Sequence, residues 1–285
     1  MSWCDVGSPV VFRHLSSLRV VSKQPKLVVV GGGNMGSALV HGLLRGGYST
    51  SNLSIVDVNA AVRSELVHTF PDVLIAEAMP ACDEAVIAVK PQDVSSACAS
   101  AVAAGAQRVV SIAAGVSLVS LQRACGEGVR VVRAMPNTPA LVGLAATAMA
   151  ASATCTAQDR AWARALLETV GIVIEVDETM LDAFTGLVGS GPAYVFYVAE
   201  ALQAAGIAAG FDNETSATLV AQLFAGAASL LQREPLRARE LRERVTSPQG
   251  TTAAGIAKLG ELRVADAIVA AVQAATQRSK ELGAQ

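Results

Sequence analysis

The chain has 285 residues, with 52% hydrophobic, 16% charged and 4% aromatic side chains and a formal net charge of −2. This length allows one large domain or two modest ones around an aliphatic core. The charge excludes the basic footprint of a nucleic-acid-binding protein. No apolar run of membrane-spanning length is free of proline, glycine or charge, so we expect a soluble protein.

The five cysteines and three histidines are scattered along the chain, without a Cys-x-x-Cys pair. Buried thiols in a reducing compartment therefore fit better than disulfides, and we predict a cytoplasmic protein without a metal. Residues 1–25 stand apart because they carry Arg13, Arg19 and Lys23 with several serines and the single acid Asp5. An organellar transit peptide has such a composition, but we prefer a disordered N-terminal extension.

Between residues 26 and 177, short β-branched runs alternate with longer amphipathic segments. This alternation is typical of a parallel sheet with helices on both faces, so we predict a Rossmann-type doubly wound α/β domain. The expected strands are Lys26–Val30, Leu53–Val58, Val73–Ala76, Glu84–Val89, Arg108–Ile112 and Val129–Arg133. The expected helices are Ser37–Arg45, Ala60–Thr69 and Val94–Ala104. Two further strands with a helix between them could extend the sheet at Ala145–Ala151 and Ile172–Val176.

Residues 178–285 show helical patterns without a strand signal between them, so we predict an all-helical dimerisation domain. One expected helix, Ala193–Ala209, has Glu200 as its only charge. A helix that is apolar nearly all round is buried in a core or a subunit interface, and the small size of this domain favours an interface. The other expected helices are Leu181–Leu187, Glu214–Gln232, Leu236–Val245, Thr251–Leu259 and Val264–Leu282.

A glycine-rich loop follows the first expected strand and fits the pattern G-x-G-x-x-G. In such a loop Gly31 permits a tight turn, Gly33 lets the backbone approach a pyrophosphate, and Gly36 allows close packing of helix on strand. The start of the next helix supplies free N–H groups for the phosphates. We therefore predict a dinucleotide cofactor, with Asn34 and Met35 also in contact with it.

Asp57 ends the second expected strand. A carboxylate there can accept hydrogen bonds from the adenosine ribose, which favours NADH and repels the 2′-phosphate of NADPH. Arg63, one turn into the next helix, could swing toward such a phosphate, but we prefer to interpret it as part of a solvated helix face. The choice between NADPH and NADH stays open, with a preference for NADH.

Residues 88–91 and 111–115 each follow an expected strand and should line the crevice where an open α/β sheet binds its ligand. The proline-stiffened loop of residues 135–139 follows the sixth expected strand. Lys90 could donate a proton, contact a phosphate or anchor its loop, and Asn137 could fix a carboxamide or belong to a rigid turn. The candidate cofactor-binding residues in these segments are Val89, Lys90, Pro91, Ala113, Ala114 and Asn137.

The segment Val-Thr-Ser-Pro-Gln-Gly-Thr-Thr at residues 245–252 concentrates hydroxyls and backbone N–H groups at an expected helix start. Such a place can hold a small anionic ring without a metal or a histidine. The alternative is an ordinary helix N-cap, which would compete for the same N–H groups.

Together these motifs resemble those of the pyrroline-5-carboxylate reductase family. The resemblance spans about residues 26–284, and several of its motifs are long and unlike generic dinucleotide-binding patterns. It is carried by residues 32–36 (Gly-Gly-Asn-Met-Gly), 89–91 (Val-Lys-Pro), 111–116 (Ser-Ile-Ala-Ala-Gly-Val), 133–140 (Arg-Ala-Met-Pro-Asn-Thr-Pro-Ala), 185–194 (Thr-Gly-Leu-Val-Gly-Ser-Gly-Pro-Ala-Tyr) and 245–252.

The resemblance implies that NADPH or NADH reduces the C=N bond of 1-pyrroline-5-carboxylate to L-proline. It also implies a homodimer whose helical domains interlock, often assembled into a larger ring. The substrate-binding residues would be Ser247, Gly250, Thr251 and Thr252. In this family Thr252 would hydrogen-bond the ring nitrogen as the catalytic residue, while Ser247 and nearby N–H groups hold the carboxylate next to the cofactor crevice.

The sequence departs from the family pattern at two places. Gln249 stands where the family usually has glycine, so a positive φ there would strain the loop. The family often has a His-Pro step before the basic helix, whereas this chain has Arg-Glu-Pro-Leu at residues 233–236, offset in spacing.

Two alternatives remain. The first is a related imine reductase or a β-hydroxyacid reductase. The latter would need a lysine on the first helix of the second domain, and residues 178–210 contain none. A non-catalytic dinucleotide-binding regulator would not need the hydroxyls of Ser247 and Thr252.

Overall fold

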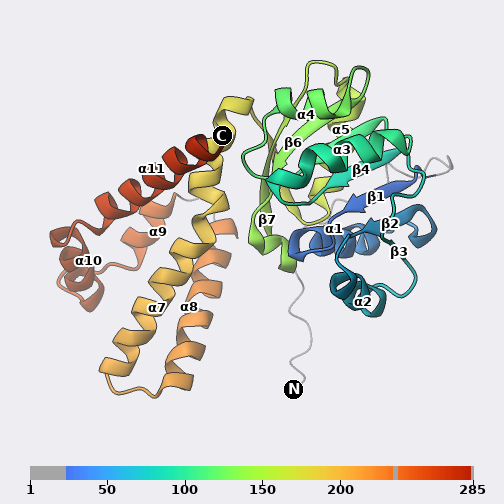
Figure 1. The fold of residues 1–285 in the computed structure, drawn as a ribbon. Coiled ribbons are helices and arrows are strands. Elements are labelled where there is room, and N and C mark those ends of the chain that lie inside the picture. Colours follow the sequence, from blue (N-terminus) through green and yellow to red (C-terminus); the bar gives the residue numbers. More distant parts are fainter. Residues whose placement is uncertain (1–23, 234–236, 284–285) are drawn as a thin grey trace.

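The computed structural model describes residues 24–233 and 237–283. The predicted N-terminal extension therefore lies almost wholly outside the described residues, as do three residues of the Arg-Glu-Pro-Leu segment. Figure 1 shows an α/β body and a group of helices that projects away from it. None of the helices in the described ranges is long and apolar enough to cross a membrane.

An eight-stranded sheet with the order β3-β2-β1-β4-β5-β6-β7-β8 forms the α/β body. Neighbouring strands are parallel except β6 and β7, which are antiparallel. The strands are β1 Leu27–Val30, β2 Leu53–Val56, β3 Leu74–Ala76, β4 Glu84–Ile87, β5 Arg108–Ser111, β6 Arg130–Met135, β7 Ala145–Ala151 and β8 Gly171–Glu175. The predicted parallel sheet is thus confirmed, and β7, for which the sequence predicted no direction, is antiparallel to β6. Residues 136–144 are too few for the crossover that a parallel neighbour requires.

The central strand β1 separates two apolar layers. Leu27 and Val29 pack into one layer, and Val28 and Val30 pack into the other, because successive side chains of a strand point to opposite faces. The helices of this domain are α1 Asn34–Arg45, α2 Ala60–Thr69, α3 Val94–Ala103, α4 Leu118–Cys125 and α5 Ala157–Glu168. Residues of α1, α2 and α5 join the first layer, and residues of α3 and α4 join the second.

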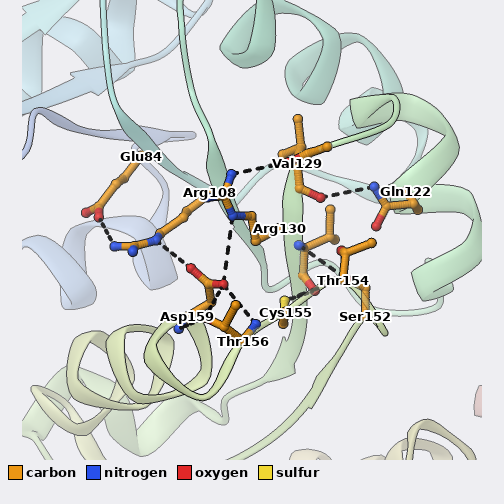
Figure 2. A network of polar contacts seen from close by, with 12 residues as sticks. Glu84, Arg108, Gln122, Val129, Arg130, Ser152, Thr154, Cys155, Thr156 and Asp159 are labelled. Carbon is orange, nitrogen blue, oxygen red and sulfur yellow. Dashed lines mark hydrogen bonds and ion pairs between the residues drawn. The ribbon is translucent and has the colours of Figure 1, made fainter.

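A polar network ties the amino ends of β4 and β5 to α5 (Figure 2). Arg108 donates from Nε to Asp159 Oδ1 at 2.8 Å and from Nη1 to Glu84 Oε1 at 3.1 Å. Trp162 donates from Nε1 to the second oxygen of Glu84 at 2.7 Å. Burial raises the pKa of the Glu84 carboxyl, although the hydrogen bonds from Trp162 and Arg108 oppose this effect. The network lies at the sheet edge opposite the carboxyl ends of the strands, so it stabilises the fold and takes no part in the cleft.

The remaining helices leave most of their surface exposed. They are α6 Leu181–Phe184, α7 Gly191–Ala208, α8 Asn213–Arg233, α9 Ala238–Arg244, α10 Thr251–Glu261 and α11 Val264–Gly283. Figure 1 shows α7 and α8 as a long antiparallel pair, with α10 at the end of the group far from the sheet. In α7 no residue is buried, and Phe196 and Tyr197 are 63% and 74% exposed. A single chain therefore does not bury the apolar surface of these helices.

Two local features differ from the sequence prediction. Helix α4 was not predicted, because its eight residues are too short a segment to show a clear helical period. The helix expected over Leu181–Leu187 divides into α6 and a π-helical turn at Thr185–Gly189, after which α7 starts with Gly191-Pro192. Such π turns are frequent at functional sites.

Candidate active site

The glycine-rich loop joins β1 to α1, which begins at Asn34 and not at Ser37. Gly31 has φ of 103°, and a Cβ there would lie 2.5 Å from the carbonyl oxygen of Ala88. A Cβ on Gly36 would lie 2.0 Å from the carbonyl oxygen of Gly31, so the fold needs glycine at both positions.

Gly33 differs from these two glycines. A Cβ on Gly33 would meet no atom within 4 Å, so the packing of the protein does not explain the glycine. Gly33 is also the N-cap residue of α1, and no side chain caps this helix. Its first N–H groups therefore remain available to an anion, and the open space at Gly33 lets that anion approach.

Asp57 lies directly beside this loop. Its Oδ2 accepts a hydrogen bond from the backbone N–H of Gly32 at 2.8 Å, and its Oδ1 accepts one from the N–H of Asn59 at 2.8 Å. Arg63 donates to the carbonyl oxygen of Asp57 and pairs with Glu77, and its side chain is only 22% exposed. The interpretation of Arg63 as part of a solvated face is therefore wrong.

A cleft of about 320 Å3 opens at the carboxyl ends of the strands. This volume lies within the range of small-molecule sites, about 300–1,000 Å3. Five of the predicted cofactor residues line it, namely Met35, Val89, Ala113, Ala114 and Asn137. Lys90 and Pro91 are exposed residues outside this lining.

Asn137 is buried, and its amide group joins separate parts of the fold. Its Nδ2 donates to the carbonyl oxygen of Val188 in the π turn at 3.1 Å, and its Oδ1 accepts from the N–H of Ala146 in β7 at 3.0 Å. These bonds favour the structural alternative for this residue over a role in fixing a carboxamide. One N–H and one oxygen lone pair of the Asn137 amide remain for a further hydrogen bond.

The hydroxyl-rich segment forms the connection between α9 and α10. Ser247, Thr251 and Thr252 are exposed. The N-cap of α10 is Gly250, and no side chain caps the helix, so the N-cap interpretation of Ser247 is wrong. Gly250 packs tightly, because a Cβ there would lie 2.3 Å from Ser247 Oγ.

Gln249 has φ of 59°, in the left-handed region that favours glycine. The departure from the family pattern therefore does strain the loop, by an amount typical of a non-glycine residue in this region, roughly 1–2 kcal/mol.

Within one chain the hydroxyl-rich segment does not reach the cleft. Helix α10 lies at the far end of the helical group from the sheet (Figure 1). Among the described residues, no hydrogen bond or ion pair joins residues 245–252 to residues 26–177. The two halves of the expected site are thus separate in a single chain.

Comparisons with known proteins identify the family of this chain. A model described as pyrroline-5-carboxylate reductase dimerisation matches residues 178–282, and one described as NADP oxidoreductase coenzyme F420-dependent matches residues 26–115. The pyrroline-5-carboxylate reductase of Methanosarcina acetivorans is 38% identical, with 90% of this chain and 98% of the relative covered. That of a Synechocystis strain is 39% identical over the same shares. The chain belongs to the pyrroline-5-carboxylate reductase family.

Solved structures of this family share the fold. The pyrroline-5-carboxylate reductase of Coxiella burnetii has a TM-score of 0.84 and 31% identity, covering 91% of this chain and 99% of its own. The Plasmodium falciparum pyrroline carboxylate reductase, solved with NADP bound, has a TM-score of 0.80 and 28% identity, with 91% and 98% covered. The family resemblance that the motifs predicted is thereby confirmed, as is the Rossmann-type domain followed by a helical domain. A dimerisation domain shows that this reductase is an oligomer.

Sequence reasoning missed one group of cleft residues in this reductase. Gly189 of the π turn lines the cleft together with Met135, Pro136 and Thr138. The motif at residues 185–194 contributed to the family resemblance, but its place beside the loop after β6 depends on the bond between Asn137 and Val188. No local pattern encodes that bond.

Proposed function

We propose that this chain reduces the C=N bond of 1-pyrroline-5-carboxylate to L-proline with NADPH or NADH, in the synthesis of proline. The observation that carries the proposal is the glycine-rich loop, which has an uncapped helix start and opens beside a cleft of small apolar residues. The full-length likeness to named reductases supplies the substrate.

The residues of the α/β domain fit a nicotinamide dinucleotide. The open space at Gly33 and the N–H groups of α1 suit the pyrophosphate, and Asp57 lies where a ribose would follow. When bound, the cofactor supplies a hydride from its nicotinamide ring. The residues that we assign to cofactor binding are Gly31, Gly33, Asn34, Met35, Asp57, Val89, Lys90, Pro91, Ala113, Ala114 and Asn137.

The residues of the α9–α10 connection fit the substrate. The uncapped start of α10 offers N–H groups and a positive partial charge to the carboxylate, with Ser247, Gly250 and Thr251 around it. The Thr252 hydroxyl donates to the ring nitrogen of the imine or accepts from it once it is protonated, so it orients the C=N bond. The nitrogen gains its proton from water through this hydroxyl, while the carbon gains the hydride.

A homodimer completes the site. Helix α10, which begins at Thr251, lies far from the sheet of its own chain (Figure 1), and apolar side chains of α7, α8, α10 and α11 are exposed. A second copy that packs on these side chains would bring its α10 to the cleft of the first. The family resemblance also implies a ring of dimers, which the mass of the native protein would reveal.

The domain limits and the compartment are further parts of the proposal. We place the domain boundary at residues 177–178, because β8 ends at Glu175 and the dimerisation match begins at residue 178.

We propose a cytoplasmic location because Cys82, Cys98, Cys125 and Cys155 are buried free thiols, which suits a reducing compartment.

The activity itself is tested with purified protein, pyrroline-5-carboxylate and either cofactor. We expect the absorbance of the reduced cofactor to fall only when pyrroline-5-carboxylate is present, with proline as the product. The absence of turnover with both cofactors would refute the proposed function.

Mixing two inactive variants tests the shared site. Gly33→Asp blocks the cofactor cleft by charge and bulk without a clash, and Thr252→Ala removes the hydroxyl from the substrate loop. Refolded together, they should form mixed dimers with one intact site, giving about a quarter of the wild-type activity if subunits pair at random. If each site used one chain only, the mixture would be as inactive as the separate variants.

A further inference from the structure

We propose that Glu77 makes this enzyme prefer NADH over NADPH, because Glu77 holds Arg63 in an ion pair that leaves residues 53–78 without a free cation for the 2′-phosphate. The inference rests on the proposed function only in assuming that a nicotinamide dinucleotide occupies the cleft. It concerns the rim formed by the ends of β2 and β3 and the start of α2.

Arg63 is the only arginine or lysine between residues 53 and 78, the stretch that forms this rim. Its guanidinium group has two partners. Nη1 donates to the carbonyl oxygen of Asp57 at 2.9 Å, and Nη2 lies 2.8 Å from Glu77 Oε2. The side chain therefore bridges the ends of two neighbouring strands and does not extend toward solvent.

The other groups of the rim also disfavour a second phosphate. The carboxylate of Asp57 lies against the glycine-rich loop, where it accepts from Gly32. The start of α2 is already capped, because Asn59 Oδ1 accepts from the N–H of Ala61 at 2.9 Å. This helix start thus lacks the fully open N–H groups found at α1.

The charges of the rim sum to −1, since Asp57 and Glu77 are acidic and Arg63 is basic. A ribose 2′-hydroxyl is neutral and can donate to the Asp57 carboxylate, so NADH gains a hydrogen bond there. A 2′-phosphate would instead meet a net negative rim and would have to separate Arg63 from Glu77 before pairing with it.

Binding of the two cofactors tests this proposal without substrate. Each reduced cofactor is titrated into the intact protein at low ionic strength, and its fluorescence gives a Kd. We expect the wild type to bind NADH about tenfold or more tightly than NADPH. In Glu77→Gln, which keeps the size of the side chain but removes its charge, the NADPH Kd should fall about three- to fivefold, the range of an exposed charge pair. The NADH Kd should change less than about twofold, because NADH does not use Arg63.

Two further variants make the test specific. Glu65→Gln removes the same charge from the exposed face of α2 but has no contact with Arg63, so it should leave the ratio of the two Kd values unchanged. Arg63→Ala should have little effect on NADPH binding in the wild type but should abolish the gain in Glu77→Gln, because only a released guanidinium can bind phosphate.

Tighter binding of NADPH than NADH by the wild type would overturn the proposal, as would equal effects of Glu77→Gln and Glu65→Gln. Binding without turnover of pyrroline-5-carboxylate would refute the proposed function and leave the cofactor ratio measurable.

Discussion

In β1 every residue is at most 6% exposed, whereas no residue of α7 is buried and its Phe196 is 63% exposed. The α/β domain thus buries a core of its own within one chain, whereas most apolar side chains of α7 and α8 stay exposed. The loop proposed to bind the cofactor also lies within this domain, while the loop proposed to bind the substrate lies in the helical domain, whose apolar surface is exposed. The boundary between the domain that buries its own core and the domain that needs a partner is therefore also the boundary between the proposed cofactor-binding and substrate-binding loops.

The largest expected loss of activity comes from a charge placed on the exposed apolar surface of the helical domain. Phe196→Asp would bury an unpaired carboxylate when two copies associate, so the variant should be monomeric and its activity should fall by about 100-fold or more. Sedimentation gives the oligomeric state, and a cofactor titration should still show binding. Val119→Asp is the matched control, because Val119 is 67% exposed on α4. If Phe196→Asp remained an active oligomer, the helical domain would not depend on a partner at this surface.

Within the α/β domain, two glycine variants separate packing from binding. Gly36→Ala places a methyl group 2.0 Å from the carbonyl oxygen of Gly31, so the free energy of unfolding should fall by about 1–3 kcal/mol. Gly33→Ala meets no atom within 4 Å and should unfold like the wild type, but should bind cofactor at least about tenfold more weakly. Chemical denaturation and cofactor titration measure the two effects. Equal stability of both variants would contradict this assignment.

Asn137 connects the two regions, so its loss should affect both. Asn137→Ala removes the bonds to Val188 and Ala146 and leaves a partly buried carbonyl and a partly buried N–H without these partners. We expect a decrease of about 1–3 kcal/mol in the free energy of unfolding. Because the π turn would lose its anchor, kcat should fall as well, and the NADH Kd should rise, since Asn137 also lines the cleft assigned to the cofactor. An unchanged melting temperature and kcat would mean that the bonds contribute nothing.

The smallest expected effect lies in the substrate loop. Gln249→Gly should raise the free energy of unfolding by at most about 1 kcal/mol, because relief of the positive φ is partly offset by the greater entropy of glycine in the unfolded chain. Gln249→Val should lower it, since a β-branched side chain tolerates this conformation least. Denaturant unfolding of the three proteins gives the order. A valine variant as stable as the glycine variant would show that the loop is not strained.

Local pattern predicted most of the α/β domain. The bounds of α2 and β7 agree with the expected segments, because periodicity and turn residues determine such elements locally. The direction of β7 was missed because it depends on the length of the connection before it. The partner of Arg63 was missed for a similar reason, since Glu77 approaches it only when β2 and β3 pair.

The candidate site shows the same limit. The glycine-rich loop, the cleft residues and the hydroxyl-rich segment were each found as motifs. Their distance from one another was not, because the separation of α10 from the cleft arises from the arrangement of whole helices. Sequence motifs identify the parts of a shared site but do not say which copy of the chain supplies each part.

Because α10 lies far from the sheet of its own chain (Figure 1), the proposed shared site would make catalysis a property of the assembly, governed by mass action. Upon dilution below the dissociation constant of the dimer, activity per milligram should decline even though every chain stays folded in its α/β domain. Ligands that touch both copies would oppose this decline, because whatever binds only the assembled form shifts the equilibrium toward it. The concentrations of substrate and of enzyme would then together determine the fraction of the protein that is assembled and active.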